Sequence, residues 1–209
     1  MTPGARVAAA AIAAAVLGIA GCDGLRTGPT VVETPDIVWE PSAPSGPLED
    51  DPYVQAAVAA ELGYVLAVNA RDFTIAQLTE TTTAERIEES FRTFLGRHGR
   101  DDPEAFAIPG PYPRSAISVT EHPDGTGADV LMCDVSGSWY ITEEHPVATI
   151  EDVPALSMTF VVVEEDGVLK LDDVRGGEGA CDPSGIAVGW FDPAPVPASG
   201  ELRSPLQGD

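Results

Sequence analysis

The chain has 209 residues, of which 11 are basic and 34 acidic, and its formal net charge is −23 at pH 7. This charge argues against a nucleic-acid partner, because phosphates require a basic surface. It also argues against direct adhesion of the protein surface to an anionic bilayer. A solvated acidic surface is the simplest interpretation, and cationic partners or ions are the alternative.

The first 22 residues have the layout of an export signal. Arg6 precedes an uninterrupted apolar run over residues 7–20, and this run is shorter than the roughly 20 residues that cross a bilayer. A charged start, a short apolar middle and small residues at the end predict a signal peptide over residues 1–21. Residues 19–22, Ile-Ala-Gly-Cys, resemble the bacterial lipobox. The alternative is an ordinary signal peptide that ends by chance on a cysteine.

The lipobox resemblance implies that Cys22 carries a diacylglyceryl group and becomes the first residue of the finished chain. The membrane would then be a partner through this anchor, and the domain would face the extracytoplasmic side of the cell membrane. Two acyl chains suffice for stable anchoring, whereas one is marginal. The bias against Asn and Lys, which occur once each as Asn69 and Lys170, is typical of a high-GC genome such as that of an actinobacterium.

The other two cysteines, Cys133 and Cys181, predict a disulfide. An odd number of cysteines in an exported protein leaves one thiol to explain, and lipidation of Cys22 would account for it. The remaining pair can oxidise outside the cytoplasm. Two buried free thiols are the alternative.

Proline content divides the rest of the chain. Residues 22–50 contain five prolines and are predicted to form a linker, because proline interrupts both helices and central strands. Within it, residues 37–39, Ile-Val-Trp, could dock as an edge strand. Residues 51–192 form the predicted domain. Residues 193–209, rich in Pro, Gly and Ser, predict a disordered tail.

Two helices are expected at the start of the domain. Asp51-Pro52 suits a helix start, and apolar residues then recur at helical spacing on two flanks up to Asn69, which predicts a largely buried helix. Residues 73–78 could add one helical turn. Thr82 and Glu85 have the spacing of a capping box, and the apolar pattern that follows predicts a second helix ending near residues 96–99.

The remainder of the domain shows strand periodicity. Alternation predicts strands over residues 115–121, 129–135 and 155–164, with a shorter one at 138–142. Asp166-Gly167 predicts a hairpin turn, followed by a strand over 168–174 and a last short one over 186–191. Helices followed by antiparallel strands indicate an α+β fold. The expected architecture is a long N-terminal helix packed in a curved antiparallel sheet of about four to six strands.

Residues 69–73, Asn-Ala-Arg-Asp-Phe, after an Ala-rich helix resemble the opening of nuclear-transport-factor-2-like (SnoaL-like) domains, and a cystatin-like roll is the nearest alternative. The resemblance covers residues 51–174 and implies a cone-shaped fold. The family includes small enzymes, which use a pocket Asp or His as base, and proteins without known chemistry. No residue of this chain matches a catalytic position of the family by motif.

The chain has no Gly-x-Ser-x-Gly, nucleotide loop or His-Glu-x-x-His, and His98, His122 and His145 are more than 20 residues apart. The acidic clusters at 143–144, 164–166 and 172–173 lack the spacing of a calcium loop. We therefore expect no catalytic residue, cofactor or metal site.

The sequence favours a non-enzymatic envelope lipoprotein whose domain binds an unidentified envelope protein or small ligand. The alternative is a small pocket enzyme of the isomerase or dehydratase type that uses a carboxylate base. A buried Asp or His with a shifted pKa in a deep apolar pocket would favour the enzyme. A filled interior with an exposed apolar patch would favour the binding module.

Overall fold

The computed structural model describes residues 29–98, 105–150 and 154–205. The helices are α1 (Pro52–Ala70), α2 (Ala76–Thr79) and α3 (Ala84–His98). The strands are β1 (Asp36–Glu40), β2 (Phe106–Ala107), β3 (Arg114–Glu121), β4 (Gly127–Asp134), β5 (Ile141–Thr142), β6 (Leu156–Glu165), β7 (Val168–Ala180) and β8 (Val188–Asp192). The expected α+β class is confirmed.

The main sheet is antiparallel and has the order β3-β4-β6-β7. Its hairpins follow local turn chemistry. Between β6 and β7, Asp166 and Gly167 have φ values of 53° and 79°, and these positive angles suit a tight hairpin turn. Two further pairs, β1-β8 and β2-β5, lie outside this sheet.

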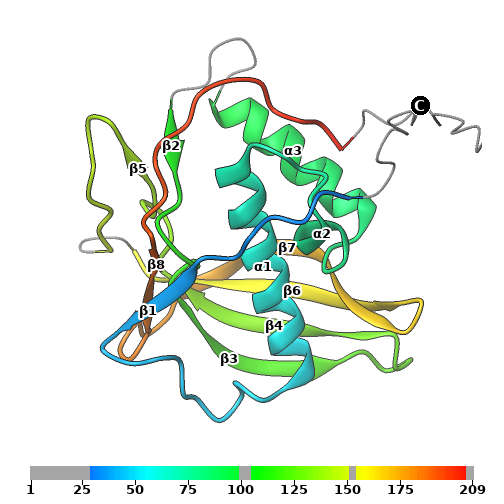
Figure 1. Cartoon of the computed structure of the whole chain (residues 1–209). Helices are drawn as coiled ribbons and strands as arrows, with labels where there is room; N and C mark the ends of the chain where they lie inside the picture. Colours follow the sequence, from blue (N-terminus) through cyan, green and yellow to red (C-terminus); the bar gives the residue numbers. More distant parts are fainter. Residues whose placement is uncertain (1–28, 99–104, 151–153, 206–209) are drawn as a thin grey trace, which may run out of the picture.

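Helix α1 crosses one face of the main sheet, and α2 and α3 pack beside its C-terminal half (Figure 1). The helix begins at Asp51, whose Oδ1 accepts from the amides of Tyr53 and Val54 at 2.9 and 3.3 Å. It ends at Ala70, and its C-cap, Arg71, adopts a left-handed conformation. Helix α1 has the length and apolar composition of a membrane span, but it packs in the protein interior as core helices do.

The interior has two principal apolar clusters that meet along α1. Val54, Ala57 and Ala60 pack on the main sheet against residues such as Val130 and Phe160. The C-terminal half of α1 instead joins a cluster with α2, α3 and the smaller strands, formed by Val65, Leu66, Val68, Phe73, Phe91, Phe94, Trp139 and Phe191 among others. The middle of α1 therefore lies between two cores.

The capping box predicted at Thr82 and Glu85 is displaced by one residue. Helix α3 starts at Ala84, and its cap is Thr83, whose Oγ1 accepts from the Arg86 amide at 3.4 Å. The backbone on both sides of Thr82 is instead paired with Leu171 of β7. This pairing fixes Thr82 outside the helix, and its hydroxyl takes no part in capping.

The segments expected to form a linker and a tail both contain backbone-paired residues, and the possible edge strand at residues 37–39 is present as part of β1. Strand β1 pairs with β8 over its whole length, and the carbonyl of Thr30 accepts from the Ala76 amide at 2.8 Å. Near the other end of the chain, Arg203 pairs through its backbone with Arg71 and Phe73. The prolines flank these paired segments rather than interrupt them, so the packed region extends beyond residues 51–192 at both ends.

Candidate functional site

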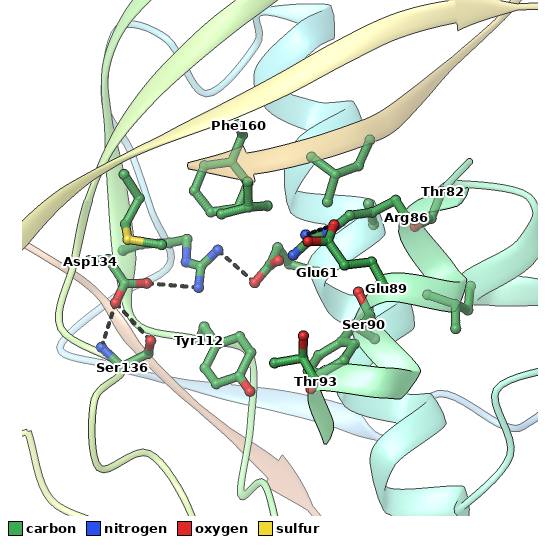
Figure 2. A pocket seen from close by; sticks show the side chains of 17 residues that line it. Glu61, Thr82, Arg86, Glu89, Ser90, Thr93, Tyr112, Asp134, Ser136 and Phe160 are labelled. Carbon is green, nitrogen blue, oxygen red and sulfur yellow. Dashed lines mark hydrogen bonds and ion pairs between the residues drawn. The ribbon is translucent and has the colours of Figure 1, made fainter. Parts of the chain in front are cut away.

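A cavity of about 340 Å³ lies where α1 passes between the two cores (Figure 2). Its size is at the lower end for small-molecule pockets. Apolar residues from α1, α2 and the sheet form part of its wall: Ala60, Leu78, Met158, Phe160, Leu171 and Val174. The polar lining comes from α1, α3, the segment between α2 and α3, and the residues at or next to the ends of β3 and β4: Glu61, Tyr64, Thr82, Arg86, Glu89, Ser90, Thr93, Tyr112, Arg114, Asp134 and Ser136.

Arg114 is held between two carboxylates and two aromatic rings. Its Nη1 lies 2.6 Å from Glu61 Oε2, and its Nη2 lies 2.7 Å from Asp134 Oδ2. The guanidinium carbon lies 5.1 Å from the ring centre of Tyr112 and 4.8 Å from that of Phe160. These distances are typical of cation–π contacts. The side chain of Arg114 is only 9% exposed, so the ion pairs lie in a largely water-excluded wall.

Local structure explains why these charges meet. Arg114 and Asp134 lie directly opposite each other in the β3-β4 register. Glu61 is the only charged residue of α1, and it lies at the point where the helix faces the end of that hairpin (Figure 2). Asp134 is further fixed by Ser136, whose amide and hydroxyl donate to Oδ1 at 2.9 and 2.7 Å.

Burial changes the acidity of the groups in this wall. Burial raises the pKa of Glu61 above its ordinary value of 4.5, and Arg114 opposes that rise. The pKa of Tyr112 is raised well above 10, first by burial and then by the neighbouring Tyr64 and Glu61. A phenol with this pKa is neutral at physiological pH, so Tyr112 can offer an O–H donor but not a phenolate base.

Helix α3 forms the opposite wall. Arg86, Glu89, Ser90 and Thr93 follow helical spacing and line the cavity together. Arg86 Nη1 lies 2.9 Å from Glu89 Oε2 and 4.0 Å from Asp173 Oδ1 on β7. Each guanidinium that lines the cavity is therefore already in contact with two carboxylates.

One hydroxyl in the cavity wall has no partner among the described residues. Thr82 is 3% exposed, and its Oγ1 makes no hydrogen bond. Leaving a buried polar group unpaired costs about 1–3 kcal/mol. Arg114 Nε is likewise buried without a hydrogen-bond partner. Such groups are satisfied by a water molecule or a ligand.

A second cavity of about 260 Å³ shares Tyr64, Thr93, Tyr112 and Ser136 with the first. Its remaining lining is mostly apolar and comes from both sides of the larger core: Val68, Phe94, Phe106, Ile108, Gly137, Trp139 and Tyr140. The polar cavity therefore adjoins an apolar one across a shared wall.

The predicted cysteine pair is close in space. Cys133 and Cys181 have their sulfurs 2.01 Å apart, at disulfide distance, and join β4 to the segment after β7. They lie outside the set of cavity-lining residues. Cys22 and the signal segment lie outside the described residues, so the lipid site stays a prediction.

His122, His145 and the three acidic clusters lie outside the set of residues that line the cavity. His122 contacts Asp129 at 3.0 Å in the β3-β4 hairpin, His145 is exposed, and His98 ends α3. Within the three described ranges, no group of His, Cys, Asp and Glu is arranged to hold a metal. Asp172 and Asp173 bind Thr83 and Arg175, respectively.

No sequence motif identifies the cavity residues, because they come from several segments that are far apart in the chain. Glu61 did carry a signal, since a lone carboxylate in a helix that is apolar on two flanks is a candidate for a cavity wall. Comparison with protein-family models, curated proteins and solved structures finds no match for this chain.

Proposed function

We propose that the protein is a lipid-anchored envelope protein whose domain binds a small ligand without transforming it. The cavity between α1, α3 and the main sheet carries this proposal, together with the unpaired Thr82 hydroxyl in its wall. The lipobox resemblance at residues 19–22 supports the location. The placement of α1 against an antiparallel sheet supports a nuclear-transport-factor-2-like or cystatin-like arrangement, with the sheet curved around the helix.

Binding fits the geometry better than catalysis because the cavity carboxylates are occupied. Glu61 and Asp134 both contact Arg114, and Glu89 contacts Arg86. Of the described residues that line the cavity, none is a histidine or cysteine. At Glu61 the pairing with Arg114 opposes the rise in pKa that burial causes, because an ion pair favours the charged form of a carboxylate.

The anchor would hold the domain close to the membrane. Because Thr30 is already fixed beside α2, only residues 23–29 separate Cys22 from the packed region. At most about 25 Å can be spanned by a chain of this length. The ligand site would therefore work within a short distance of the bilayer surface.

Two measurements test this function. Cys22→Ala should move the protein from the membrane fraction to the soluble fraction, and unchanged membrane retention would refute the anchor. For the ligand, the protein purified from its own membranes should release a small molecule on denaturation, detectable by mass spectrometry. Thr93→Trp, which fills the cavity from α3, should reduce that release, whereas Arg92→Trp on the neighbouring face of α3 should not.

A small pocket enzyme is the second candidate, and the raised pKa of Glu61 favours it. A carboxylate of raised pKa in a cavity can serve as a general base or acid. Under this alternative, the released ligand would change chemically when incubated with the protein, and Glu61→Gln would stop the change. A ligand that is recovered unaltered after prolonged incubation supports the binding module.

A further inference from the structure

The charge of the cavity wall restricts what can enter it. Three carboxylates, from Glu61, Glu89 and Asp134, and two guanidiniums, from Arg86 and Arg114, line the cavity, which leaves a net charge of −1 when all are ionised. The chain as a whole carries −23. An anionic ligand would therefore meet a repulsive potential both on approach and at the wall.

Neither guanidinium is available as an anion receptor. Arg114 already contacts Glu61 and Asp134, and Arg86 contacts Glu89 and Asp173. The Nε of Arg114 has no hydrogen-bond partner in the part of the chain that the structure describes, but the same guanidinium already contacts the carboxylates of Glu61 and Asp134. A ligand anion at this position would lie next to those two carboxylates.

The acceptors of the wall, by contrast, have spare capacity. A carboxylate has about four lone-pair sites, and Arg114 contacts Glu61 and Asp134 through one oxygen each, Oε2 and Oδ2. The buried Thr82 hydroxyl is fixed by the backbone pairing with Leu171 and has no partner among the described residues. A ligand that brings N–H donors and positive charge satisfies both features.

We propose that the cavity binds a small organic cation, an amine that is protonated at physiological pH. Its ammonium group meets the excess of carboxylates and donates hydrogen bonds in the polar cavity that Thr82 lines. Its carbon skeleton packs on the apolar wall formed by residues such as Phe160 and Leu171 and extends towards the adjoining apolar cavity. This inference rests on the proposed ligand-binding function and specifies the ligand's chemical class.

Three probes of one shape but different charge test the inference: benzylamine, benzyl alcohol and benzoate. Each is titrated calorimetrically into the full mature chain in detergent at neutral pH. We expect benzylamine to bind at least about tenfold more tightly than benzoate, and added salt to reduce that difference. If benzoate binds as tightly as benzylamine, or if only benzyl alcohol binds, the cation inference is overturned while a ligand-binding cavity remains.

Two variants locate the binding. Thr82→Val keeps the side-chain shape and removes the hydroxyl, so benzylamine should bind several-fold more weakly, whereas Thr120→Val on the exposed edge of β3 should change nothing. Glu89→Gln alters an exposed carboxylate, which the fold tolerates, and should weaken benzylamine and strengthen benzoate by about two- to threefold each. Unchanged affinities in both Thr82→Val and Glu89→Gln would overturn the assignment to this cavity. If none of the three probes binds and the natural protein releases no small molecule, the proposed function fails with the inference.

Discussion

At the scale of single residues, Arg114 is the side chain on which the cavity wall depends. It lies between two carboxylates and two aromatic rings. Its ionic partners lie on two other elements, Glu61 on α1 and Asp134 on β4. Buried ion pairs add little net stability compared with apolar packing, but removal of one partner leaves uncompensated charge. The effect of substitution at Arg114 therefore depends on what remains of its partners.

Arg114→Met should lower the free energy of unfolding by about 3 kcal/mol, because Glu61 and Asp134 are left facing each other without a cation. Denaturant unfolding measures the loss. Arg92→Met is the matched control, since the Arg92–Glu88 pair at 2.7 Å is exposed and should contribute less than about 0.5 kcal/mol. Adding Glu61→Gln and Asp134→Asn to Arg114→Met should recover most of the loss. Equal effects of Arg114→Met and Arg92→Met would show that the triad is not electrostatically coupled.

Glu61 should make stability depend on pH in an unusual direction. Its pKa in the folded state is raised above 4.5 by burial, so the folded protein holds this proton more tightly than the unfolded chain does. The corresponding stabilisation is fully present below pH 4.5 and is lost as the pH rises through the raised pKa. The Glu61→Gln variant has no carboxyl group at this position, so it does not lose this stabilisation as the pH rises. The stability of the variant relative to the parent should therefore increase with pH across this window in denaturant titrations, and a difference that is flat or falls with pH would contradict the assignment.

At the scale of elements, the close approach of α1 to α2 depends on Gly63. A Cβ built at this position would lie 2.5 Å from the carbonyl oxygen of Gln77, which is backbone and cannot move aside cheaply. Gly63→Ala should therefore destabilise the fold by about 1–3 kcal/mol despite the better helix propensity of alanine. Gly96→Ala in α3, where no atom lies within 4 Å of the added Cβ, should instead stabilise by about 0.5 kcal/mol. Thermal unfolding of the two variants would show opposite shifts, and two shifts of the same sign would refute the steric argument.

The Cys133–Cys181 pair links β4 to the segment after β7 across a sequence separation of 48 residues. On the chain-entropy model, a loop of this size corresponds to about 4 kcal/mol of stabilisation, less any strain. Replacing both cysteines with serine should lower unfolding stability by about 2–4 kcal/mol. Non-reducing peptide mapping should recover the two cysteines in one linked peptide pair. Two alkylatable thiols in the untreated protein would contradict both expectations.

Local elements could be predicted from the sequence, and long-range pairings could not. The β6-β7 hairpin follows from Asp166-Gly167, because turn chemistry acts between neighbouring residues. Strand β1 is different: its residues pair with β8, which lies about 150 residues further along the chain. Pattern analysis could propose that residues 37–39 form an edge strand, but nothing local specified β8 as its partner.

The same distinction applies to the candidate site. The approach of Arg114 to Asp134 requires the turn of the β3-β4 hairpin and also the register shift between Ala116 and Ser118. The placement of Glu61 against this pair requires the packing of α1 on the sheet. The position of Thr82 in the cavity wall requires its backbone pairing with Leu171. Neither tertiary contact has a signature in the spacing of residues.

At the scale of the whole molecule, the two ends of the described chain contact each other and the start of α2. Thr30 pairs with α2, and Arg203 Nη1 reaches Thr30 Oγ1 at 3.1 Å and Asp72 Oδ2 at 3.3 Å. Figure 1 shows the segments leading to both ends passing over the helical side of the molecule. Under the proposed lipid anchor, this junction would connect the anchored N-terminal segment to the domain.

Arg71 holds the C-terminal segment in this junction, and its removal should release that segment. Its largely buried guanidinium donates to the carbonyl of Gly200 at 3.1 and 2.6 Å and to that of Ala198 at 3.2 Å. Hydrogen bonds from a charged donor contribute about 1.5–3 kcal/mol each and are not additive. Arg71→Met should therefore speed hydrogen exchange at the amides of Phe73 and Arg203 by at least about tenfold and expose residues 194–205 to proteolysis.

The main sheet provides the control for the Arg71 variant. Arg175→Met on β7, where the arginine is exposed and contacts only Asp173 among the ion pairs of the described residues, should leave those exchange rates unchanged. If Arg71→Met neither speeds hydrogen exchange at these two amides nor exposes residues 194–205 to proteolysis, the segment is held by its backbone pairing alone. If it also accelerates exchange in β4 and β6, the junction is coupled to the main sheet, and a change at the N-terminal end of the described chain would reach the cavity.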